Sequence, residues 1–97
     1  MIFHLLVRHD WHSATADAPV AMPGDEGDVH CCDESQIAAV RQRYLAPDAE
    51  LVALAFDPTR LPAETRDEPV AGGEPDRSPH VYGALPRDQV AFVRAVR

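Results

Sequence analysis

The sequence predicts an α+β domain in which a small, split and mostly antiparallel sheet packs with two helices. Short apolar segments at 2–7, 51–56 and 90–96 have the length and composition of strands. A capping motif at 33–36 opens a helical pattern, and a segment rich in proline interrupts the second half of the chain. This irregular order favours an α+β domain of four to six strands, with both helices against one face of the sheet.

The N-terminal segment predicts one strand, one short helix and a loop. Residues 2–7 form a strand that is apolar apart from His4, whose side chain then points toward one face of the sheet. Asp10 is a suitable N-cap for a short helix, which Trp11 anchors in the core. The residues of this helix that face the core are Trp11, Ala14 and Ala18. Prolines and glycines at 19–27 then impose an irregular loop.

The clearest helix signal follows a brief extended segment at 29–30. Asp33 and Gln36 stand at the N-cap and N3 positions of a capping box, so we expect a helix to begin there. Pro47 ends the pattern. Apolar residues recur between these limits at helical spacing, as Ile37, Val40, Tyr44 and Leu45.

The second half of the chain predicts one central strand and several short ones. Residues 51–56 are consecutively apolar, which is typical of a strand covered on both faces. The segment 57–79 is rich in proline and contains the turn signal Gly72-Gly73, so it leaves room for a short strand near 65–68 and little else. The remaining predicted elements are a strand at 81–82, a turn at 85–88 and a closing strand at 90–96.

Length and charge limit the classes of partner. The 97 residues suit one domain spanning 1–97, and the net charge of −7 repels nucleic acids and anionic membranes. We therefore expect neither as a partner, and the oligomeric state stays open. No apolar run reaches the length of a signal peptide or a membrane span, which favours a cytoplasmic location. All nine basic residues are arginine, whose planar side chain suits phosphate contacts.

The two cysteines are expected to be structural. Cys31 and Cys32 are adjacent, a geometry that rarely closes a disulfide. The nearest base, His30, points to the opposite face of an extended strand, so we expect buried thiols and no thiol nucleophile. His9, His12, His30 and the cysteines show none of the spacings of established zinc motifs, so the sequence predicts no metal site.

Three histidines are the candidate functional residues. His4, His30 and His80 each lie in a predicted extended segment, where the two-residue period can direct all three into one cleft. Imidazole can hold a ribose hydroxyl or a phosphate, transfer a proton near neutral pH or bind a metal. The alternative is that each histidine is buried and bonded to backbone carbonyl groups.

Several stretches of the sequence resemble one bacterial family. His4 in the first strand, Gly27-Asp28-Val29-His30-Cys31-Cys32 before a capped helix, and Ser78-Pro79-His80-Val81-Tyr82-Gly83-Ala84-Leu85-Pro86 near the end resemble the domain of unknown function 952 family over nearly the whole chain. That family has no established activity and is similar to ADP-ribosyltransferase-like folds, in which a split sheet surrounds NAD or an ADP-ribose group. The resemblance places His4, His30 and the 80–82 segment at the ligand.

The chain also departs from the family pattern at several positions. Asp28 and Ser78 stand where the family has large apolar residues, which weakens the expected apolar wall of the pocket. Cys32 replaces a hydroxyl residue and Ala84 replaces a proline. Glu68 matches an acidic residue that the family places after tryptophan, although Asp67 occupies the tryptophan position here.

Three alternatives for the function remain open. In the first, the domain binds NAD or an ADP-ribose-type nucleotide through His4, His80 and Tyr82, with His30 and Glu68 as the catalytic residues of a transfer or hydrolysis reaction. Phosphate contacts would come from Arg41, Arg43 or Arg66. In the second, the same pocket belongs to a non-catalytic module that binds a small ligand or a protein. In the third, the polar replacements have removed the pocket.

Overall fold

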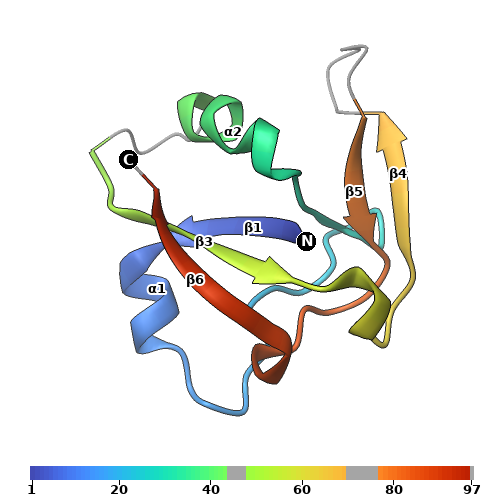
Figure 1. Cartoon of the computed structure of the whole chain (residues 1–97). Helices are drawn as coiled ribbons and strands as arrows, with labels where there is room; N and C mark the ends of the chain where they lie inside the picture. Colours follow the sequence, from blue (N-terminus) through green and yellow to red (C-terminus); the bar gives the residue numbers. More distant parts are fainter. Residues whose placement is uncertain (44–47, 70–76, 97) are drawn as a thin grey trace.

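The computed structural model describes residues 1–43, 48–69 and 77–96, and its elements follow the chain in an α+β order (Figure 1). The strands are β1 (Ile2–Val7), β2 (Val29–His30), β3 (Leu51–Phe56), β4 (Thr65–Pro69), β5 (Arg77–Val81) and β6 (Val90–Val96). The helices are α1 (Arg8–Ser13) and α2 (Ile37–Arg43), accompanied by the 3-10 turns η1 (Glu34–Gln36), η2 (Pro58–Arg60) and η3 (Arg87–Gln89).

The first sheet has the order β1-β3-β6 and is antiparallel throughout. Its central strand β3 pairs with β1 from Ile2↔Phe56 to Val7↔Leu51, and with β6 along its other edge. All six residues of β3 are buried, which confirms the strand predicted at 51–56 to be covered on both faces.

The second sheet has the order β2-β5-β4 and is also antiparallel, so the prediction of a split antiparallel sheet is confirmed. The strand expected at 65–68 is β4, whereas the one expected at 81–82 covers Arg77–Val81 instead. The difference arises because β4 offers a pairing partner along this whole segment. Pro79 fits within β5 because its carbonyl group still accepts a bond from the Cys31 N–H, at 2.9 Å.

Two apolar cores lie on the two faces of the first sheet. One core joins Leu54 and Phe56 to Val29 and Val81 of the second sheet, and Trp11 of α1 packs against it. The other core comprises Phe3, Leu5, Cys32, Leu51, Ala53 and Ala55, and α2 covers it with Ile37 and Val40. The expectation that both helices share one face is therefore wrong, because neighbouring residues along each strand are apolar and each face needs its own cover.

The helix α1 is shorter and begins earlier than predicted. It covers Arg8–Ser13, with Val7 and not Asp10 at its N-cap. The pairing of β1 with β3 runs to Val7, and the Arg8 N–H then donates to the Glu50 carbonyl at 2.8 Å, so the chain passes directly from strand to helix. Ala14 is already extended, which leaves Ala18 outside the helix.

The helix α2 begins as the capping motif predicts. The Gln36 side chain accepts a hydrogen bond from the Asp33 N–H at 2.8 Å and donates to the Arg77 carbonyl, also at 2.8 Å. The cap thus also fixes the start of α2 against β5. The predicted helix positions Tyr44 and Leu45, the stop at Pro47 and the turn at Gly72-Gly73 lie outside the described residues. Within the described part of the chain, no helix has the length and apolar character needed to cross a membrane.

Candidate functional site

Polar side chains gather on one face of the second sheet. In β5, Ser78, His80 and the following Tyr82 alternate with Pro79 and Val81, so the three polar residues share a face. The antiparallel register places His30 opposite His80 and Glu68 opposite Ser78. Asp28 precedes His30 by two residues and therefore points to the same side. The opposite face of this sheet contributes Val29 and Val81 to the core.

A tight turn brings Asp28 into this face. The Gly27 N–H donates to the Gly24 carbonyl at 3.0 Å, and the Gly24 N–H donates to the Asp28 carbonyl at 3.2 Å. Gly27 adopts a φ of 84°, in the left-handed region that a side chain would disfavour. The glycine at this position lets the loop reverse direction just before β2.

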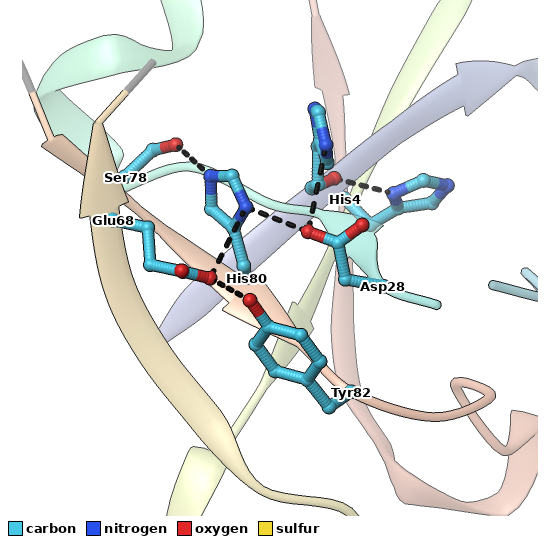
Figure 2. A network of polar contacts seen from close by, with 7 residues as sticks. His4, Asp28, Glu68, Ser78, His80 and Tyr82 are labelled. Atoms are coloured by element: carbon cyan, nitrogen blue, oxygen red, sulfur yellow. Dashed lines mark hydrogen bonds and ion pairs between the residues drawn. The ribbon is translucent and has the colours of Figure 1, made fainter. Parts of the chain in front are cut away.

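His80 is the centre of the polar network (Figure 2). Its Nδ1 lies 2.8 Å from Asp28 Oδ2, and its Nε2 lies 3.2 Å from Ser78 Oγ. The side chains of His80 and Asp28 are only 8% and 5% exposed. Because a carboxylate only accepts, Nδ1 carries the proton of this bond, and the short, buried contact fixes the orientation of the ring.

Glu68 and Tyr82 extend the network on the other side of His80. Glu68 Oε1 lies 3.7 Å from His80 Nδ1 and accepts a hydrogen bond from the Tyr82 hydroxyl. This bond raises the pKa of Tyr82, because the phenol must lose the proton that it donates. The guanidinium of Arg66 lies 4.8 Å from the centre of the Tyr82 ring. Glu68 is therefore engaged by two partners.

His30 and His4 lie beside this network, toward the first sheet. The ring of His30 lies 4.5 Å from that of His80, and its Nε2 is 3.6 Å from Asp28 Oδ2. His4 Nδ1 lies 3.3 Å from the His30 carbonyl oxygen, so this nitrogen is the donor. Burial lowers the pKa of His4, and the bond to His30 offsets only part of that effect. His4 is therefore neutral near pH 7, and its Nε2 carries a lone pair.

A cavity of about 230 Å³ opens next to His4 and His30. Its polar residues include Gln36, Arg43 and Ser78 together with the two histidines, and Cys31 and Cys32 also line it. The apolar residues of its wall are Phe3, Leu5, Ala39 and Val40. A second, wider hollow of about 550 Å³ shares His4 and His30 and is lined by Asp25, Glu26 and Asp28 among others. The two histidines thus separate an apolar cavity from an acidic hollow.

The structure brings all the predicted site residues into one neighbourhood. His4 and His30 line the cavity, whereas His80, Tyr82 and Glu68 form the network beside it and line neither hollow. The catalytic and ligand-binding roles assigned to these five residues stay predictions.

Asp28 and Ser78 were not predicted as site residues. From the sequence they were interpreted only as polar replacements that weaken the apolar wall of the pocket. Both side chains contact the ring nitrogens of His80. A signal for this was present, because Asp28-x-His30 and Ser78-x-His80 each place two polar groups two residues apart on a strand.

The two thiols are buried, as expected. Cys31 and Cys32 are free, and His30 faces away from the core that Cys31 joins. Burial raises the pKa of Cys31 to about 12 and that of Cys32 to about 11. Thiols with such pKa values hold almost no thiolate near neutral pH, so they are poor nucleophiles and poor metal ligands.

The fold and the site together define a small α+β domain with a histidine and carboxylate cluster next to an apolar cavity. The model of the family described as "Protein of unknown function (DUF952)" matches residues 5–93, and the chain belongs to this family. Protein CC0527 from Caulobacter crescentus has the same fold: its crystal structure matches with a TM-score of 0.77 and 24% identity, covering 99% of this chain and 85% of that one. A double mutant of CC0527 matches with a TM-score of 0.76 and 23% identity over the same shares. No curated protein matches the chain.

Proposed function

We propose that this domain binds a ribose-containing nucleotide of the NAD or ADP-ribose type, with the ring and ribose of one nucleoside in the histidine cavity. The observation that carries the proposal is that two histidines and several apolar residues line the same cavity. His4 and His30 line one side of the cavity, and Phe3, Leu5 and Val40 are among the apolar residues around it. Sites of this kind bind a planar ring through the apolar part and fix its orientation through the few polar groups.

His4 supplies the most specific polar contact. Its Nδ1–H is held by the His30 carbonyl, and its lowered pKa keeps the ring neutral near pH 7. The Nε2 lone pair is thereby oriented to accept a hydrogen bond from a ribose hydroxyl. The exposed ring of His30, whose side chain is 54% accessible, adds a second edge for the sugar or the base.

The size and charge of the two hollows determine where the phosphates go. A volume of about 230 Å³ is below the range of about 300–1,000 Å³ for whole drug-sized ligands, so the cavity takes one nucleoside of a dinucleotide. Asp25, Glu26 and Asp28 would repel phosphates from the wider hollow. We therefore propose that the pyrophosphate binds near Arg43, which lines the cavity.

The ADP-ribosyltransferase-like fold that the family resemblance implies would extend this proposal to a reaction. In that case His30 acts at the reacting centre, since it lines the cavity, and His80, whose ring lies 4.5 Å from that of His30, positions it. One observation favours the alternative of a non-catalytic binding module. The Glu68 carboxylate contacts Tyr82 and His80 and does not line the cavity, so it is not placed to contact a ligand bound there.

Calorimetric titration of NAD, ADP-ribose and adenosine into the chelator-treated protein tests the proposal. His4→Asn is the informative variant because the asparagine amide can still donate to the His30 carbonyl but lacks the Nε2 acceptor. We expect it to weaken binding about tenfold, the value of one hydrogen bond. His9→Ala, at an exposed histidine of α1, is the matched control and should bind as the wild type does.

Two results would contradict the proposal: no heat at millimolar nucleotide, or equal affinities for the wild type and His4→Asn. Where binding occurs, release of nicotinamide from NAD, followed by chromatography, separates an enzyme from a binding module. Release that His30→Ala abolishes supports the reaction, and binding without release supports the module.

A further inference from the structure

We propose that Asp28, His30 and His80 form a binding site for a divalent transition-metal ion, for which Zn²⁺ is the natural probe. Each residue offers one donor atom, and the three donor atoms all lie within 4.8 Å of one another. Two imidazole nitrogens and one carboxylate oxygen are a ligand set that suits Zn²⁺ and its neighbours in the first transition row. The argument for this site does not rest on nucleotide binding, although His30 belongs to both proposed sites.

The distances are close to those of a metal-bound set. Bonds of about 2.0–2.2 Å in a tetrahedral site place neighbouring donor atoms about 3.4 Å apart. Asp28 Oδ2 lies 2.8 Å from His80 Nδ1 and 3.6 Å from His30 Nε2. These two separations bracket the required value, and the three donor atoms all lie within 4.8 Å of one another, so the side chains must move closer together to enclose an ion.

The backbone holds these donors in place before any ion arrives. Asp28 and His30 share a face because they are two residues apart in an extended segment, and the register of β2 with β5 places His80 directly opposite His30. His30 and His80 thus lie on paired strands, which hold ligands more precisely than loops do, and Asp28 directly precedes β2. This cross-strand pair also explains why no short zinc motif appears in the sequence.

The charge of the site favours a cation. Asp28 is buried, and its ionic partners within the described residues are only the two imidazoles, without an arginine. The Glu68 carboxylate adds a second negative charge, 3.7 Å from His80 Nδ1. A buried carboxylate needs a compensating positive charge, which either a proton on an imidazole or a metal ion can supply.

The surroundings of His80 suit the metal-bound state. Binding at Nδ1 requires the proton there to leave that nitrogen, and the neutral ring then carries its proton on Nε2. Nε2 lies 3.2 Å from Ser78 Oγ, so its N–H can donate to the hydroxyl. Metal-bound histidines usually donate their second ring N–H to such a partner, which fixes the tautomer and the ring.

The site has a route to solvent on its acidic side. Asp28 and His30 line the wider hollow, together with Asp25 and Glu26. Negative side chains at the rim of a hollow raise the local concentration of cations and repel anions. Magnesium and calcium prefer all-oxygen ligands, so they should not replace a transition metal at two imidazoles.

Titration of Zn²⁺ and Co²⁺ into the chelator-treated full chain tests this proposal, read out by calorimetry and by the visible absorption of bound Co²⁺. We expect one ion per chain, with intense Co²⁺ bands typical of a four-coordinate site and no competition from excess Mg²⁺. His30→Ala and Asp28→Ala each remove one ligand and should weaken binding at least a hundredfold, because even the loss of an outer partner costs about 10- to 100-fold. Circular dichroism verifies that both variants fold.

His9 and His12 on α1 are the matched controls, because exposed histidines also bind metal weakly. His12→Ala should leave the affinity unchanged. The proposal is overturned if the wild type binds no ion at micromolar protein, or if His30→Ala binds as the wild type does while His12→Ala loses binding. His4→Asn keeps all three ligands, so it should lower nucleotide affinity but not Zn²⁺ affinity, and the two proposals can fail separately.

Discussion

The buried contact between Asp28 and His80 should be worth much more to stability than an exposed ion pair. The two side chains are 5% and 8% exposed, and their atoms approach to 2.8 Å. Asp28→Ala leaves the His80 Nδ1–H without its acceptor, and His80→Ala leaves a buried carboxylate without its donor. Each single substitution should therefore lower the free energy of unfolding by about 3–5 kcal/mol.

A double-mutant cycle isolates the contribution of the contact itself. The double variant lacks both partners of the contact. Its loss in free energy of unfolding should therefore be smaller than the sum of the two single losses by about 1.5–3 kcal/mol, the value of a hydrogen bond to a charged group. Unfolding in urea, followed by circular dichroism on chelator-treated protein, gives the four free energies of unfolding. An osmolyte such as TMAO, present throughout, keeps the weakest variant folded.

The pair Arg8 and Glu50 is the control for this cycle. Its atoms also lie within ion-pair distance, at 3.3 Å, but the side chains are 57% and 77% exposed. Its coupling energy should not exceed about 0.5 kcal/mol. The reasoning is refuted if the coupling between Asp28 and His80 is as small as that of the control pair.

Two further predictions concern the titration of buried groups. The folded state lowers the pKa of His4, so the unfolded chain binds this proton first, and stability should fall as the pH drops below about 6.5. Urea midpoints at pH 7.5 and 5.5 should differ less in His4→Asn than in the wild type, and an equal difference would contradict the assigned pKa shift. Cys31 and Cys32, with pKa values of about 12 and 11, should react with a disulfide reagent at pH 8 only after unfolding. Complete labelling of the native protein within seconds would show that the thiols are not buried.

The strands and helix starts that could be predicted are those set by local pattern. The run of apolar residues at 51–56 predicts a buried strand wherever it lies in the sheet, and it is β3. Asp33 and Gln36 specify the start of a helix by hydrogen bonds within four residues. The start of α1 was harder to predict. Pairing between β1 and β3 determines where β1 ends, and α1 begins at the next residue.

The sequence by itself determined the fold class, the resemblance to a family and the histidines worth considering, because strand alternation and capping act over a few residues. Only the tertiary structure decided that Asp28 bonds to His80, which lies 52 residues further along the chain. That contact depends on the register between β2 and β5, and a shift of one residue would turn His80 toward the core. Register is set by how the whole apolar set of both sheets packs, so no short segment encodes it.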